Sequence, residues 1–257
     1  MRARIPWLGL AVLFAAFLAW EAVSRGFAGL GDYVPPPSRV LGMLGQILVS
    51  GELLFHAQAT LARFAGAYAL AAVVAVSAGV AFGSSRVLYS FVEPLVELLR
   101  PMPSPATIPI AILFLGIGNE MKIAVTAYAC TWPILLNTLD GVRGVDRVLR
   151  QTAATFGVGP WRTLFQVVIP AASPQIVTGL RVSLAIALIL VTTSEMVVAD
   201  DGLGFFILDL QRSFRIPEMY AAILALAVLG YLLNQAFLTI DGWVMAWHRL
   251  GTRKEVV

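Results

Sequence analysis

Charged side chains are scarce in this sequence: Asp, Glu, Lys and Arg make up 13% of its 257 residues, whereas soluble proteins carry about 25%. Hydrophobic residues make up 59%, and the mean hydropathy is +0.83. Apolar runs near the roughly 20 residues that cross a hydrocarbon core recur along the whole chain. The composition therefore excludes a soluble globular protein and predicts an all-α integral membrane protein.

Reactive and ligand-binding side chains are also few. The single cysteine, Cys130, lies inside an apolar run and provides neither an intrachain disulfide nor a CxxC or Cys/His metal spacing. His56, one of two histidines, is expected in or near an outer loop with no second ligand beside it. No HExxH motif or Ser/His pair falls within the apolar runs, and no GxxxxGK[ST] phosphate loop is present. We therefore expect no catalytic residue, metal or cofactor in this chain.

Six apolar runs predict six transmembrane helices in one domain over residues 1–257. The runs cover residues 5–23, 59–83, 94–118, 122–139, 176–199 and 220–240. The first follows Arg2 and Arg4, as in secretory signals and uncleaved first helices, and no small-x-small site closes it, which favours the uncleaved helix. Residues 26–56 are expected to form a short helix outside the membrane, with Ser38 as its N-cap.

Two runs contain residues that are unusual in regular spanning helices. Gly79 and Gly83 in the second run have small-xxx-small spacing, which indicates close helix packing. The third run is interrupted by four prolines, which a helix interior does not tolerate: Pro101, Pro103, Pro105 and Pro109. Irregular backbone at membrane depth occurs where protein or a water-filled cavity surrounds it, so we expect these prolines to line the central path.

The basic residues indicate orientation rather than nucleic-acid binding, because they are spread along the chain without a basic patch and interleaved aromatics. With both termini in the cytoplasm, eleven cations fall on that face: Arg2, Arg4, Arg86, Arg143, Arg147, Arg150, Arg162, Arg181, Arg249, Arg253 and Lys254. Six fall outside, with Arg100 ambiguous: Arg25, Arg39, Arg63, Lys122, Arg212 and Arg215. The positive-inside rule therefore places both termini in the cytoplasm.

The polar loop at residues 140–170 contains residues that are typical of the starts and ends of two short helices. An apolar face is expected from Val145, Val148, Leu149, Thr152 and Phe156. Gly157 then ends the first helix as a C-cap, Gly159-Pro160 starts a second, and Pro170 is expected to stop it before the fifth span. The prediction is a compact cytoplasmic helix-turn-helix, apolar on one side and basic on the other, which we call the knob.

The knob resembles the E-A-A-x-x-x-G-x9-I-x-L-P loop of binding-protein-dependent ABC permeases. Gln151 stands at the Glu position, Thr152 and Ala153 at the two Ala positions, Gly157 at the Gly, and Val167, Ile169 and Pro170 at the final I-x-L-P. The Gln and Thr depart from the family pattern. Weaker patterns resemble the nitrate, sulfonate and taurine branch: Pro35-Pro36-Pro37-Ser38, Arg100-Pro101-Met102-Pro103 continuing to Ile108-Pro109-Ile110, Ser194-Glu195-Met196, and Asp201-Gly202-Leu203-Gly204.

The resemblance implies a type I ABC importer permease fold in the bacterial inner membrane. Its partners would be two ATPase subunits that hold ATP and Mg, a second permease copy, most simply a homodimer, and a periplasmic or lipid-anchored substrate-binding protein. The substrate would be a small anion such as a sulfonate, taurine or nitrate, although related systems handle thiamine precursors and aromatic acids. The ATPase-contacting residues implied are Val148, Leu149, Arg150, Gln151, Thr152, Ala153, Phe156, Gly157, Val167, Ile169 and Pro170.

Some alternatives remain open in the sequence. An ion-coupled secondary transporter would usually show two related halves, and no internal repeat is visible. An intramembrane enzyme would need a catalytic constellation within the spans, whereas a scaffold without transport activity would look the same. Ser194 and Glu195 are further candidates for the path, because an ionisable group in a span is costly. Glu195 is equally compatible with a hydrated position at the outer interface.

Overall fold

The computed structural model describes residues 7–26 and 30–245, and its regular elements in these ranges are all helical. The long helices are α1 (Trp7–Gly26), α4 (Glu52–Ser84), α7 (Asn119–Arg143), α10 (Ile169–Val197) and α12 (Ile216–Val244). The shorter ones are α2 (Leu30–Tyr33), α3 (Pro37–Val49), α5 (Arg86–Leu99), η1 (Ser104–Thr107), α6 (Ile108–Leu115), α8 (Arg147–Thr155), α9 (Pro160–Thr163), η2 (Leu164–Val168) and α11 (Leu203–Arg212). The terminal cations Arg2, Arg4, Arg249, Arg253 and Lys254 lie outside the described residues.

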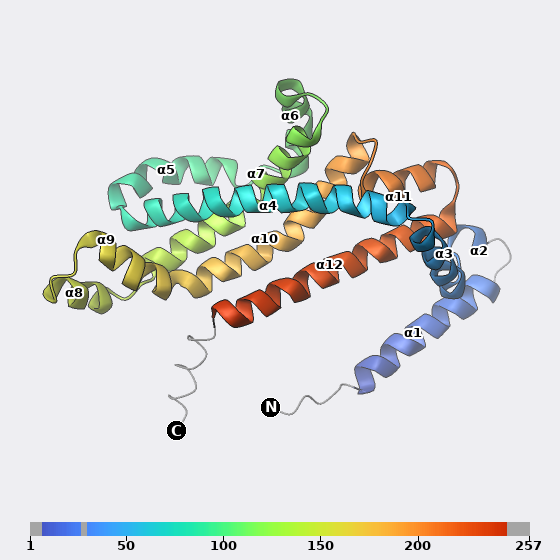
Figure 1. Ribbon diagram of the computed structural model, residues 1–257, viewed down its shortest axis with the longest axis horizontal. Helices are drawn as coiled ribbons and strands as arrows, with labels where there is room; N and C mark the ends of the chain where they lie inside the picture. The colour runs from blue at the N-terminus through green and yellow to red at the C-terminus, as the bar shows by residue number, and fades with distance from the viewer. Residues whose placement is uncertain (1–6, 27–29, 246–257) are drawn as a thin grey trace.

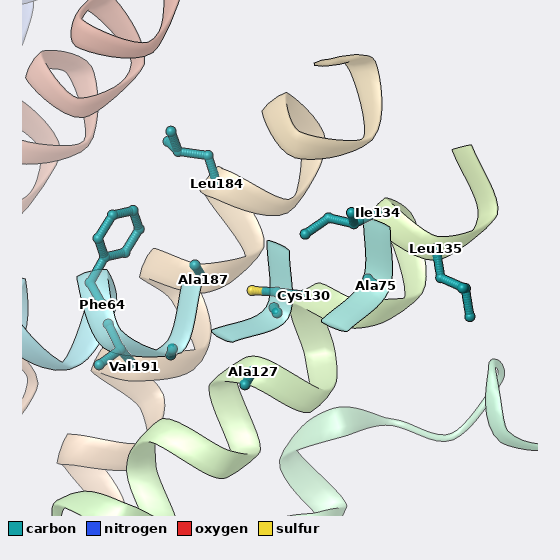
Figure 2. Packing of buried hydrophobic residues seen from close by; sticks show 11 residues of the cluster. Phe64, Ala75, Ala127, Cys130, Ile134, Leu135, Leu184, Ala187 and Val191 are labelled. Carbon is teal, nitrogen blue, oxygen red and sulfur yellow. The ribbon is translucent and has the colours of Figure 1, made fainter. Parts of the chain in front are cut away.

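Helices α4, α7 and α10 form the centre of the molecule (Figure 1). Their shared core consists largely of small side chains on α4, among them Ala67, Ala71 and Ala75, with larger apolar residues from α7 and α10 around them (Figure 2). Cys130 is completely buried in this core, as a packing residue. A Cβ built on Gly79 would lie only 2.7 Å from Thr138 Cβ on α7. The expected small-residue contact thus exists, and it joins two helices of the same chain.

Three helical segments are long and apolar enough to span a bilayer: Glu52–Ser84, Pro160–Val197 and Ile216–Trp243. A fourth would be the pair Arg86–Leu99 and Ser104–Leu115, which is bent by 91° at the break between its helices. The prolines lie at or just after this break, and Pro105 and Pro109 occupy the starts of η1 and α6, where a missing N–H costs little. Helices α1 and α7 overlap the first and fourth expected runs. Six spans therefore remain a prediction, while the all-helical fold is confirmed.

Ser38 is not the N-cap that the sequence predicted. Helix α3 begins at Pro37 with Pro36 as its N-cap residue, two residues earlier than predicted. The Ser38 hydroxyl instead donates to Glu21 Oε1 at 2.7 Å, and the Ser38 N–H donates to Glu21 Oε2 at 3.1 Å. A carboxylate from α1 thereby satisfies a free N–H at the positive end of α3, which local sequence alone does not reveal.

Pro170 does not stop the second knob helix, which was also an incorrect prediction. The chain stays helical through α9, η2 and α10, so that Pro160–Val197 forms one segment of 38 residues. Residues Leu164–Val168 adopt the wider π-helical turn, and the Ile169 N–H donates to the Leu164 carbonyl. Such a turn accommodates a proline that a regular α-helix would bend around.

Candidate functional site

Two features occupy opposite ends of the long helices (Figure 1). The knob, formed by α8, α9 and the turn between them, lies at the end where α4 and α7 finish and the segment containing α10 begins. Helices α3 and α11 lie at the other end, where α4 begins and α10 finishes. The central helices therefore connect two sites that lie far apart.

Helix α8 has a defined start and stop. The Asp146 carboxylate accepts the Val148 N–H at 2.8 Å, which caps the N-terminus. Gly157 has a φ of +70°, a left-handed conformation that favours glycine. The next N–H, from Val158, donates to the Ala153 carbonyl at 2.9 Å and closes the C-terminus. The predicted C-cap at Gly157 is thus confirmed, and it fixes the direction in which the chain leaves α8.

The knob presents large apolar side chains to the outside. Val148, Leu149 and Phe156 are exposed, and Phe156 is 81% exposed. Trp161 and Phe165 are exposed too, and their rings stack with centroids 6.3 Å apart. A group of exposed apolar side chains of this size, in a part of the chain predicted to lie outside the bilayer, is typical of an interface.

Of the remaining predicted knob residues, some lie on the outer surface of the knob and others pack against the rest of the chain. Gln151 and Thr152 are exposed, whereas Ala153 is buried. Val167, Ile169 and Pro170 are half-buried. The Arg150 guanidinium donates to the Val142 carbonyl and ties α8 to the end of α7. The role of these residues toward an ATPase stays a prediction.

At the opposite end, Glu195 is buried, with 1% of its surface exposed. Its carboxylate accepts hydrogen bonds from Thr60 Oγ1 at 2.9 Å, Arg63 Nη1 at 2.8 Å and the Gly204 N–H at 3.0 Å. The hydrated-interface interpretation of Glu195 is therefore wrong in this structure. A carboxylate buried this deeply requires such partners, because a lone charge would be strongly destabilising there.

Arg63 is the centre of this polar cluster and is only 4% exposed. Besides Glu195, its guanidinium forms an ion pair with the Asp201 carboxylate and donates to the Asp201 carbonyl at 3.1 Å. Its Nε donates to Asn119 Oδ1 at 2.7 Å. One side chain of α4 therefore joins the start of α7, the end of α10 and the segment before α11.

The two glycines before and within α11 make this contact possible. Gly202 has a φ of +104°, and a Cβ there would overlap the Glu195 carboxylate. A Cβ on Gly204 would overlap the Thr192 carbonyl oxygen. The Gly202 N–H donates to His56 Nδ1 at 3.1 Å. The motif Asp201-Gly202-Leu203-Gly204 therefore packs closely against the end of α10, because its two glycines have no Cβ that would overlap α10.

Sequence reasoning did not identify Thr60 or Arg63 as site residues. The available signal was a single arginine within an otherwise apolar run, since a charge in a span needs a partner. His56 was expected in or near a loop, but it lies in the second turn of α4. It is buried, and its ring stacks on that of Phe206 with the ring centroids 4.7 Å apart. Its partner is 146 residues away along the chain, which no local pattern reveals.

The residues proposed to line the path are not brought together in the single chain. Pro101 borders a cavity of about 960 Å³ between α5 and α7, together with Trp132 and Asn137. Ser194 is buried, and its hydroxyl donates to the Val191 carbonyl at 2.7 Å. The other three prolines of the set, Pro103, Pro105 and Pro109, are exposed. Their contribution to a path stays a prediction.

Comparison with known proteins agrees with this architecture. Residues 67–246 match the family described as binding-protein-dependent transport system inner membrane component. The chain is 28% identical to the putative aliphatic sulfonates transport permease protein SsuC of Bacillus subtilis, over 96% of this chain and 90% of that protein. It is 29% identical to the taurine transport system permease protein TauC of Escherichia coli, over 84% and 80%.

Among solved structures, an inward-facing form of the MetNI methionine ABC transporter superposes with a TM-score of 0.61 and 22% identity, covering 71% of this chain and 91% of that one. This likeness concerns the fold. The family match covers more than half of the sequence, and it describes a membrane component rather than a catalytic subunit. The chain therefore belongs to the family of binding-protein-dependent transport system inner membrane components, the permeases of ABC importers.

Proposed function

We propose that this permease forms half of the path of an importer for a small anionic solute and receives the ATPase at its knob. The observation that carries the proposal is the exposed apolar group on the knob, which lies at one end of a continuous 38-residue helical segment. A short helix with an exposed apolar face fits a groove of a partner protein. ATP binding then favours one state of the path through its differential affinity for the two states.

The anionic substrate class rests on the relatives. SsuC is named for aliphatic sulfonates and TauC for taurine, both of which carry a sulfonate group. Other relatives are named for nitrate and for bicarbonate, which are anions, whereas taurine carries an ammonium group beside its anionic sulfonate. A thiamine precursor or an aromatic acid is the second candidate. Uptake of radiolabelled taurine, nitrate and a thiamine precursor by the assembled importer separates these candidates.

The proposed assembly contains two copies of this chain, two ATPase subunits and a substrate-binding protein on the outer side. The family description itself names dependence on a binding protein. Both termini would lie in the cytoplasm, on the side of the knob. A reporter that is active only outside the cytoplasm, fused after Val257, is expected to stay silent, and activity of that fusion would reverse the proposed orientation.

The test of the knob is the Gly157→Asp substitution. Because Gly157 needs a left-handed backbone, a side chain there strains the turn and redirects the chain that leaves α8. We expect the variant to insert normally but to lose most ATP-dependent uptake, or co-purification with the ATPase. Uptake into proteoliposomes that contain the ATPase and the binding protein measures this effect.

Gly159→Asp is the matched control. Gly159 lies in the same turn and is exposed, but its φ of −63° is open to any residue and a Cβ there meets nothing within 4 Å. This control adds the same charge two residues away and is expected to transport normally. Equal uptake by the two variants and the unmodified chain would contradict a role for the knob in coupling.

A further inference from the structure

A second cavity, of about 340 Å³, lies beside the knob where four helices meet. Its walls come from the ends of α4 and α7 and the starts of α5 and α8. Four arginines and two serines line it: Arg86, Arg143, Arg147, Arg150, Ser84 and Ser85. Within the described part of the chain, no Asp or Glu lines this cavity.

The four arginines have no carboxylate partner among residues 7–26 and 30–245. The nearby carboxylates accept hydrogen bonds from other groups: Glu93 accepts the Tyr89 hydroxyl at 2.7 Å, and Asp146 caps α8. Asp140 borders the neighbouring cavity between α5 and α7. Arg86, Arg143 and Arg147 are exposed and Arg150 is half-buried, so four positive charges surround a cavity that solvent reaches, and their combined potential favours binding of an anion.

Two of the arginines are held in place by contacts that leave N–H groups free. The Arg143 guanidinium lies over the Tyr89 ring, 3.8 Å from its centroid. Arg150 donates through one terminal nitrogen to the Val142 carbonyl, while its buried Nε finds no hydrogen-bond partner in the ranges that the structure describes. A buried donor without a partner is costly and marks a position where a ligand could accept a hydrogen bond.

We propose that this cavity binds a phosphate group, carried by an anionic phospholipid headgroup or free in solution. Guanidinium groups donate paired hydrogen bonds that match phosphate oxygens, and the N-terminus of the 14-residue helix α5 borders the same cavity. Basic pockets between spanning helices at the membrane surface bind lipid phosphates. On α5, the exposed side chains of Val87 and Phe91 follow directly, and they suit contact with acyl chains.

The experiment uses the full chain in complex with its ATPase, and compares it with the Arg86→Gln/Arg143→Gln variant. Neither residue belongs to the knob helices, so ATPase contacts at the knob stay intact. Native mass spectrometry measures retention of phosphatidylglycerol against phosphatidylcholine. In a parallel arm, inorganic phosphate is titrated against the melting temperature of the delipidated complex, at constant ionic strength. The control is Arg39→Gln, which removes an exposed arginine of α3, outside both the cavity and the knob.

Selective retention of phosphatidylglycerol identifies a lipid headgroup, whereas stabilisation by inorganic phosphate without lipid retention identifies a free anion. In either case, the double variant should bind at least about tenfold more weakly, since two charged hydrogen-bond donors are lost, and Arg39→Gln should bind normally. If the double variant does not fold, the single variant Arg86→Gln, which changes an exposed residue, is measured in its place.

Two results would overturn the proposal. One is equal binding of both ligands by the double variant and the unmodified complex. The other is loss of ATPase co-purification in the double variant with unchanged phosphate and lipid binding, because the cavity would then receive carboxylates of the ATPase.

Discussion

Gly202 determines how closely the segment before α11 approaches the end of α10. Gly202→Ala places a methyl group against the Glu195 carboxylate and forces a side chain into a left-handed conformation. We expect a loss of about 1–3 kcal/mol, observed as a melting temperature several degrees lower in detergent. The control Gly45→Ala, in helix α3 with nothing within 4 Å of the new Cβ, should be neutral or slightly stabilising. Equal melting temperatures for the two variants would contradict the steric explanation.

The ion pair between Arg63 and Glu195 should be costly to break from one side. Arg63→Met leaves the Glu195 carboxylate buried without its cation, and we expect a loss of about 3–5 kcal/mol. Adding Glu195→Gln to this variant removes the stranded charge and should restore part of the stability. The comparison is Arg215→Met, which breaks a partly exposed pair with Glu218 and should cost less than about 1 kcal/mol. Thermal unfolding of the four chains measures this, and a double variant no more stable than Arg63→Met would disprove the pairing.

At individual residues, the sequence predicted local conformations and missed distant partners. The left-handed turn at Gly157 follows from a glycine after a short amphipathic stretch, and the structure confirms it. Ser38 has the right residue type and position for an N-cap, yet its partner is Glu21, 17 residues earlier in another helix. Arg63 lies 132 residues before Glu195, so only the folded chain brings the two charges together.

Among the helices, the contact between α4 and α7 depends on glycines at particular positions. Gly79→Ala would place its Cβ 2.7 Å from Thr138 and 3.1 Å from the Leu135 carbonyl oxygen, which forces the two helices apart. We expect a lower melting temperature and less protein in the membrane, with a loss of about 1–3 kcal/mol for an overpacked contact. Gly66→Ala on the same helix is the control, because its Cβ would meet Ile123 at an ordinary 3.7 Å. A Gly79 variant as stable as the Gly66 variant would rule out tight packing at this position.

The helices were largely predictable from apolar runs, and their ends were not. Each expected run overlaps a helix or the bent pair α5 and α6, because length and hydropathy are properties of local sequence. Helix α4 begins at Glu52 rather than near residue 59, because its first turns are hydrogen-bonded to the start of α11 through His56 and Thr60. Pro170 misled the prediction for a different reason: a proline normally ends a helix, but the π-helical turn before it keeps the helix continuous.

For the whole molecule, we expect two copies of this chain in the working complex. One chain carries one knob, whereas a transporter with two ATPase subunits needs one knob for each of them. Native mass spectrometry of the solubilised complex should find two copies of this chain with two ATPase copies. A single copy in the assembly, or a second and different permease, would contradict the homodimer.

The continuous segment Pro160–Val197 has a mechanical consequence. Its regular part, the 29-residue helix α10, is about 44 Å long, with the π-helical turn next to the knob at one end and Glu195 near the other. A helix of this length that moved as one body would act as a lever, because a tilt of about 5° would displace its far end by about 4 Å. There Glu195 accepts hydrogen bonds from Arg63 and Thr60, so a movement of this end that kept these contacts would carry α4 with it. Under the proposed coupling, a small push at the knob would therefore become a displacement of α10 together with α4 at the opposite end.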